Sequence, residues 1–137
     1  MVIVDDHLAL LAIAGRLPDL EVNGPVATTW GFHFRLARAL SDPAKQGSLS
    51  RRNVDPVAAM RRVLHPPPHR LVVLDSRTSI DNIVRVAVVH RANLVLAELV
   101  GAAVHHGASV RVTEANIGLH WPTTMDAEGV DFAAALI

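Results

Sequence analysis

Short runs of apolar residues alternate along this chain with longer segments of helical periodicity, and this alternation constrains the fold more than any other feature. The sequence predicts strands at 2–4, 22–29 (with a turn at Gly24-Pro25), 70–76 and 109–113. It predicts helices at 7–17, 30–40, 56–64, 79–91 and 93–106. Strands that alternate with helices favour a largely parallel sheet. We therefore expect the α/β class, with a parallel central sheet flanked by helices.

The end of the chain has weaker signals. Residues 114–129 predict a loop with at most one helical turn, and 130–136 (VDFAAAL) predict a last strand or a tail. No repeat or linker divides the 137 residues, so we expect one domain over 1–137. The apolar stretches are too short to span a membrane, the start is unlike a signal peptide, and cysteine is absent. These features predict a cytoplasmic protein with no membrane segment.

Acidic and polar residues follow several of the predicted strands. Asp5 and Asp6 come directly after 2–4, Asp75 follows the third strand, and Glu114 and Asn116 follow the fourth. In an open α/β sheet, ligands bind at the carboxyl ends of the strands. Carboxylates gathered there repel one another unless a cation such as Mg²⁺ or Mn²⁺ lies between them, and such a cation can activate water toward a phosphodiester. The alternative is that these acids are helix caps and turn residues.

The charge distribution is uneven although the net charge is zero. Residues 30–91 carry eleven Arg or Lys against four Asp, whereas the two ends are acidic. The candidate RNA-binding residues are Arg35, Arg38, Arg51, Arg52, Arg61 and Arg62. Trp30 and Phe32 lie beside two of them and are candidates for stacking on a base. The alternative is an amphipathic helix with core aromatic residues and solvated arginines.

Two known families share short segments with this chain. The segments "VIVDDH" and "LVVLDSR" resemble the acid pair and the phospho-accepting segment of receiver domains. However, Asp75 lies 69 residues after Asp6, which is too far for a receiver, and Lys45 is the only lysine, so the late-strand lysine of receivers is missing. The receiver is therefore the weaker resemblance.

The second resemblance covers most of the chain. The segments "MVIVDDHLALLAIAG", "ATTWGFHFRLARALSDPAKQGSLSRR" and "NLVLAELVGAAVHHGASVRVTEAN" resemble the PIN-domain family, in particular small actinobacterial proteins of the VapC toxin type. The resemblance places Asp5 at the first metal-binding Asp, and Thr113 and Asn116 at the end of the last core strand. It implies a single PIN-like domain that acts as a Mg²⁺- or Mn²⁺-dependent endoribonuclease. It also implies the toxin of a toxin–antitoxin pair, with an RNA substrate, an antitoxin partner and a homodimer.

The chain departs from the PIN pattern at several acidic positions. No acid lies at 32–35, the Asp expected at the head of the Ala-rich helix falls at Leu96, and Asn116 is neutral. The expected catalytic residues are Asp5, Glu98 and Glu114, and the expected metal ligands are Asp5, Asp6, Glu98 and Asn116. In this scheme Asp5 supplies the central carboxylate, and Asp6 is either a further ligand or only the cap of the following helix.

A degenerate site would instead leave a catalytically impaired PIN-like protein that binds an antitoxin, itself or RNA. At least three carboxylates that converge on Asp5 would favour the nuclease, and two or fewer would favour the binding protein.

Overall fold

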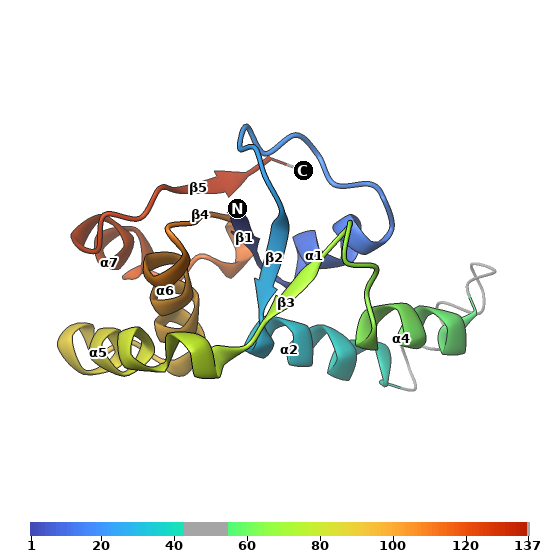
Figure 1. The fold of residues 1–137 in the computed structure, drawn as a ribbon, viewed down its shortest axis with the longest axis horizontal. Helices are drawn as coiled ribbons and strands as arrows, with labels where there is room; N and C mark the ends of the chain where they lie inside the picture. The colour runs from blue at the N-terminus through green and yellow to red at the C-terminus, as the bar shows by residue number, and fades with distance from the viewer. Residues whose placement is uncertain (43–54, 137) are drawn as a thin grey trace.

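One sheet of five parallel strands forms the centre of the protein (Figure 1). The computed structural model describes residues 1–42 and 55–136. The strands are β1 (Val2–Val4), β2 (Val26–Thr29), β3 (Val72–Leu74), β4 (Ser109–Thr113) and β5 (Phe132–Ala135). Their order is β3-β2-β1-β4-β5, and each neighbouring pair is parallel. The predicted α/β class with a parallel central sheet is confirmed, and the arrangement is consistent with a single PIN-like domain.

Six α-helices flank the sheet in the described residues. They are α1 (Asp6–Ile13), α2 (Trp30–Leu40), α4 (Pro56–Leu64), α5 (Ile80–His90), α6 (Leu94–His106) and α7 (Trp121–Ala127). Two short 3₁₀ turns, η1 (Ser76–Ser79) and η2 (Glu114–Asn116), follow β3 and β4. All five predicted helices are present, so the helical periodicity was a reliable signal.

Some boundaries differ from the prediction. Helix α1 ends at Ile13 rather than at residue 17, because Gly15 takes a left-handed conformation (φ +71°) that ends the helix. Helix α7 lies where a loop with at most one turn was expected. Its Trp121 and Met125 are one turn apart and are both buried, so the core stabilises a helix that the local sequence does not indicate.

The two faces of the sheet pack against different sets of helices, and α2 contributes residues to both apolar clusters (Figure 1). Ile3 of β1 belongs to an apolar cluster formed with α5, α6 and α7. Its neighbours Val2 and Val4 point to the opposite face and belong to a second cluster, formed with α1, α2 and α4. All three side chains are at most 1% exposed, so β1 is the fully buried central strand that its β-branched residues predicted.

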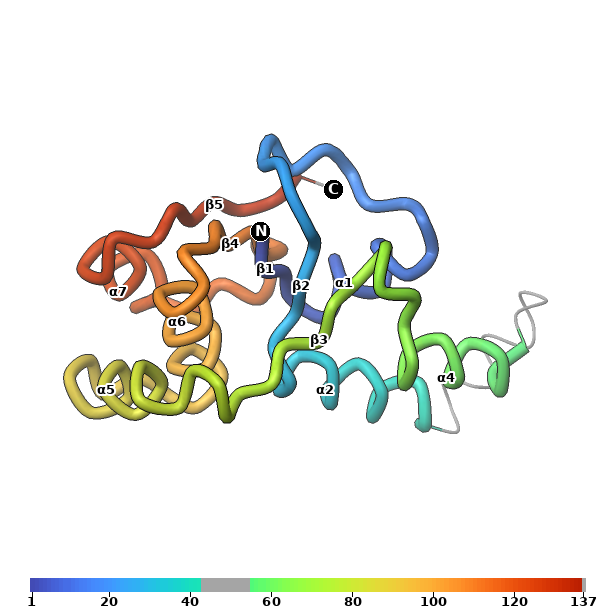
Figure 2. Tube along the Cα trace, viewed as in Figure 1, coloured from blue at the N-terminus to red at the C-terminus, as the bar shows by residue number. Residues whose placement is uncertain are grey.

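The end of the sheet at which the strands finish is called the carboxyl edge below. Helices α5, α2 and α4 lie in a row along the lower side of the molecule, where β2 and β3 end (Figures 1 and 2). Of the acids that follow the strands, Asp6 contacts α2 through Arg35, and Asp75 lines a hollow together with Trp30, the first residue of α2. No helix within the described ranges is long and apolar enough to cross a membrane.

Candidate functional site

Asp5 is a fully buried acid at the carboxyl edge. It follows β1, is completely buried, and is the N-cap of α1, with Oδ1 accepting from the Leu8 backbone N–H at 3.0 Å. Its Oδ2 accepts from the Thr113 backbone N–H at 2.7 Å, the Thr113 hydroxyl at 2.5 Å and Nδ2 of Asn116 at 2.8 Å. The expectation that Asp6 is the helix cap is therefore wrong, because Asp5 fills that position.

Asp6, the first residue of α1, contacts α2, and its Oδ1 also accepts from the His7 backbone N–H at 3.1 Å. The Arg35 guanidinium binds it in a two-pronged pair, with Nε donating to Oδ2 at 2.8 Å and Nη2 donating to Oδ1 at 3.2 Å. Nη2 also donates to Oδ1 of Asn116 at 2.8 Å, and the Asn116 amide donates to Asp6 Oδ1 at 3.0 Å. The Asn116 amide thus links both aspartates to the arginine. We call the set Asp5, Asp6, Arg35, Thr113 and Asn116 the acidic centre.

The acidic centre does not fit a divalent cation in this arrangement. Mg²⁺ and Mn²⁺ sites need several oxygen ligands that are free to coordinate. Here the Asp5 carboxylate already accepts from four donors, and the Asp6 carboxylate is paired with a guanidinium. Within the described ranges, no three Asp, Glu or His side chains form a group that could hold a metal ion. Only two carboxylates, those of Asp5 and Asp6, meet in the acidic centre, which is fewer than the three that would favour the nuclease.

Glu98 lies elsewhere at the carboxyl edge, although it was expected beside Asp5. It is on α6, and only 7% of it is exposed. Its Oε1 accepts from the Gly31 backbone N–H at 2.7 Å, and its Oε2 accepts from the Ser76 hydroxyl at 2.6 Å. Glu98 therefore joins α6 to the first turn of α2 and to η1, and its carboxylate is satisfied by neutral donors.

Glu114 is the other acid expected to be catalytic. It begins η2 and is exposed. The hydrogen bonds of Asp5 and Asp6 within the described ranges come from other residues, so Glu114 does not enter the acidic centre. Asp5, Asp6 and Asn116 are thus brought together as expected, whereas Glu98 and Glu114 are not part of that network.

Asp75 pairs locally and not with the acids after β1. Its carboxylate accepts from the Arg77 backbone N–H at 2.9 Å and from Nη2 of Arg77 at 2.7 Å. These hydrogen bonds lower the pKa of Asp75 below its ordinary value and raise that of Arg77. The receiver alternative needs Asp75 to face Asp5 and Asp6, and no hydrogen bond among the described residues joins them.

The first turns of α2 expose an aromatic pair. The Trp30 and Phe34 rings stack with centroids 5.7 Å apart and planes 17° from parallel, and the two residues are 57% and 54% exposed. Phe32, which was expected to stack on a base, is 1% exposed and packs in the core. The exposed partner of Trp30 is therefore Phe34, and the spacing of four residues between them is the signal that could have identified it.

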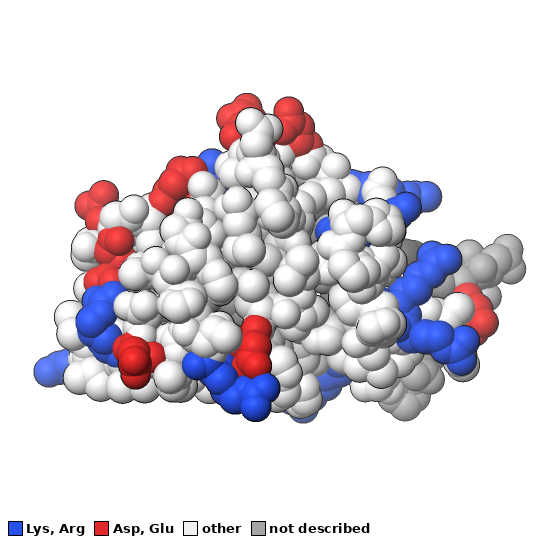
Figure 3. All heavy atoms as spheres, viewed as in Figure 1, with Lys and Arg blue, Asp and Glu red and all other residues white. Residues whose placement is uncertain are grey.

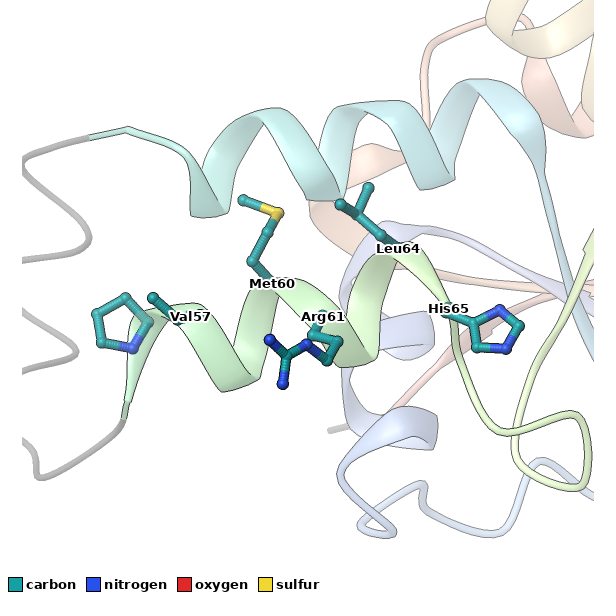
Figure 4. Close-up of a pocket in the computed structure, with 6 residues that line it drawn as sticks. Val57, Met60, Arg61, Leu64 and His65 are labelled. Atoms are coloured by element: carbon teal, nitrogen blue, oxygen red, sulfur yellow. The ribbon is translucent and has the colours of Figure 1, made fainter.

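Two hollows lie beside α2 and α4. One is lined by Trp30, Val73, Leu74, Asp75, Ser76 and Arg77. Another lies on α4 and is lined by Pro56, Val57, Met60, Arg61, Leu64 and His65; Figure 4 shows Met60 and Leu64 pointing toward α2. In Figure 3 basic side chains gather on the right, over α4, with an acidic one beside them, and acidic side chains lie at the top and, mixed with basic ones, on the left.

The six arginines named as candidates for RNA binding have different environments, and two of them, Arg61 and Arg62, lie exposed in the last turn of α4. Arg35 is part of the acidic centre, and its guanidinium carbon also lies 5.4 Å from the centre of the Phe32 ring. Arg38 is exposed, and its side chain forms no ion pair with any residue that the structure describes. Arg51 and Arg52 lie outside the described residues. The pairing of Arg35 with Asp6 joins positions 29 residues apart, so no local sequence pattern indicated it.

The sequence was compared with protein-family models and with curated proteins. No protein-family model matches the chain, and no curated protein is significantly similar to it.

Proposed function

We propose that this chain is a PIN-like domain that binds single-stranded RNA at the carboxyl edge, and that this binding needs no divalent cation. The exposed stack of Trp30 and Phe34 carries the proposal. Single-stranded nucleic acid is commonly held by aromatic rings on which bases stack. Trp30 also lines a hollow that contains Arg77 together with Asp75, the carboxylate with which Arg77 is paired.

The charge near the stack supports RNA as the ligand. Arg38 lies two turns after Trp30 on α2 and has no carboxylate partner among the described residues, so its guanidinium is free for a phosphate. The neighbouring helix α4 carries Arg61 and Arg62 in its last turn. An aromatic pair beside arginines that have no ion-pair partner among the described residues is the combination that a sequence-tolerant RNA surface uses.

The test is a titration of fluorescently labelled, unstructured RNA, read by anisotropy in the presence of EDTA. Trp30→Ala and Phe34→Ala are each expected to raise Kd roughly tenfold, because stacking contributes about 1–3 kcal/mol per base. Arg38→Ala is expected to raise Kd and to reduce the salt dependence of binding. Leu119→Ala is the control, because Leu119 is 88% exposed and lies outside these helices.

Two results would overturn the proposal. One is wild-type protein that does not bind the RNA. The other is binding that Trp30→Ala and Phe34→Ala leave at the level of the Leu119→Ala control.

A second candidate function is the metal-dependent endoribonuclease of the VapC type that the sequence resemblance implies. It is supported by Asp5, Asp6 and Asn116 meeting at the carboxyl edge, but it requires Arg35 to leave Asp6. An antitoxin partner, a homodimer and a cytoplasmic location belong to this candidate as expectations. RNA incubated with the protein and Mn²⁺ decides between the two functions: cleavage that Asp5→Asn abolishes supports the nuclease, and intact bound RNA supports the binding protein.

A further inference from the structure

We infer that Glu98 is a positioning residue for RNA: its carboxylate sets the distance between the two walls of the hollow in which a base stacks on Trp30. The inference rests on the proposed RNA binding and names the residue that fixes the geometry of that site. Glu98 itself does not touch the RNA, because only 7% of it is exposed.

The first step is the origin of the two walls. We call the hollow lined by Trp30 and residues 73–77 the Trp30 hollow. Trp30 begins α2, directly after β2, and residues 73–77 run from β3 into η1. The sheet joins the two segments as far as the pair Thr29 and Leu74, where the register of β2 and β3 ends. Beyond that pair, the distance between the walls depends on side-chain contacts.

The second step is the contact that spans the walls. Oε1 of Glu98 accepts from the Gly31 backbone N–H at 2.7 Å, and Oε2 accepts from the Ser76 hydroxyl at 2.6 Å. Gly31 follows Trp30 in the chain, and Ser76 lines the opposite wall. Both donors lie two residues beyond the last pair of the sheet, so one carboxylate links the segments where the strands have ended.

The third step is the fixed position of Glu98. Its neighbours Ala97 and Leu99 are completely buried in the core, so α6 is a firm support for the carboxylate. A Cβ at Gly31 would lie 2.8 Å from Oε1 of Glu98, which is closer than such atoms pack. The glycine next to Trp30 therefore lets the carboxylate reach the backbone of α2.

The fourth step is the consequence for Trp30. This residue is 57% exposed, so the position of its ring follows the backbone that carries it. That backbone is the first turn of α2, which Glu98 holds at one distance from Ser76. A base that stacks on Trp30 thus meets a preformed wall, and a preformed site loses less free energy to ordering when it binds.

The first experiment compares Ser76→Ala with Thr78→Ala in the RNA titration in EDTA. Thr78 is the matched control, because its hydroxyl donates to the Asp75 backbone carbonyl within the same turn and the residue does not line the Trp30 hollow. Ser76→Ala is expected to raise Kd roughly fivefold, which is within the loss expected for Trp30→Ala. The salt dependence is expected to stay the same, because no phosphate contact is removed. Thr78→Ala is expected to keep the wild-type Kd.

Two further variants separate this role from simple stability. Glu98→Gln is expected to keep Kd within about twofold of wild type, because an amide can accept from the Gly31 N–H and donate to the Ser76 hydroxyl. Gly31→Ala is expected to raise Kd, because its methyl group displaces the Glu98 carboxylate. Alanine favours a helix more than glycine does, so a role of Gly31 in helix stability alone predicts no weaker binding.

A readout without RNA follows Trp30 itself. In a Trp121→Phe background Trp30 is the only tryptophan, and the anisotropy of its fluorescence reports how firmly the ring is held. Ser76→Ala is expected to lower this anisotropy relative to Thr78→Ala, and Glu98→Gln is expected to keep it. If Glu98 were only structural, these variants would change stability and leave the anisotropy of the folded protein unchanged.

The inference is wrong if Ser76→Ala has the Kd of Thr78→Ala, or if the two variants have the same Trp30 anisotropy. Gly31→Ala with the wild-type Kd also contradicts it. Wild-type protein that does not bind RNA overturns the proposed function and the part of the inference that concerns RNA. The anisotropy then decides separately whether Glu98 fixes the position of Trp30, so the two failures can be told apart.

Discussion

At the scale of single residues, Glu98 shows how a buried acid can be structural. Each of its oxygens has one donor, the Gly31 N–H and the Ser76 hydroxyl, and these donors belong to α2 and η1. The backbone N–H of Gly31 lies in the first turn of α2, where such groups have no partner within the helix. Glu98 therefore satisfies a donor that the helix itself leaves free, and it fixes the start of α2 against α6.

We predict that Glu98→Ala lowers the free energy of unfolding by about 2–4 kcal/mol, since it leaves the Gly31 N–H without its partner and opens a space in a buried region. Urea denaturation of the purified protein measures the change. Glu114→Ala is the control, because Glu114 is exposed and outside these contacts, and its effect should stay within about 0.5 kcal/mol. Equal stabilities of the two variants would contradict the structural role of Glu98.

At the scale of elements, a partly buried acid connects two helices on the other side of the molecule. Glu128 follows the last turn of α7, and its carboxylate binds Arg85 and His90 of α5. The side chain of Glu128 is 11% exposed. The hydrogen bonds from Arg85, which have the largest effect, and from His90 lower the pKa of Glu128 from its ordinary 4.5 to about 2.

This pKa predicts how stability depends on acid pH. The folded state binds a proton at Glu128 less readily than the unfolded state, so the contribution of Glu128 is complete above about 4.5 and is lost as the pH falls toward about 2. We expect Glu128→Gln to be less stable than wild type at neutral pH, and the difference to shrink across that interval. Urea denaturation at a series of pH values measures it, with Glu114→Gln as the control. A difference that does not change with pH would show that Glu128 acts only by packing.

At the scale of the whole molecule, the two apolar clusters share one sheet. Ile3 belongs to one cluster, whereas Leu8 of α1 belongs to the other, and neither side chain is exposed. Because successive residues of β1 contribute to both clusters, loss of either cluster removes support from the same strand. The described residues are therefore expected to unfold as one cooperative unit.

We predict that Ile3→Ala and Leu8→Ala each lower the free energy of unfolding by about 2–5 kcal/mol and keep a single transition. Circular dichroism follows the helices, and the fluorescence of the buried Trp121, in a Trp30→Phe background, follows the first cluster. Coincident curves are expected for both variants. Separate transitions for the two probes would show that the two faces of the sheet unfold independently.

The sequence by itself determined the features that depend on neighbouring residues. Helical periodicity and β-branched runs identified five of the six described α-helices and the first four strands in their order along the chain, but not α7. The position of Asp5 directly after β1 placed it with Thr113 and Asn116, because parallel strands end at the same edge of the sheet.

Only the tertiary structure decided the features that depend on side-chain direction between distant segments. Phe32 and Phe34 are two residues apart on α2, yet the packing of that helix buries the first and exposes the second. Asp6 meets Arg35 of another helix, and Glu98 meets Gly31, 67 positions earlier in the chain. These partners share no local pattern, because a hydrogen bond between distant residues forms only after the helices that carry them have packed against the sheet.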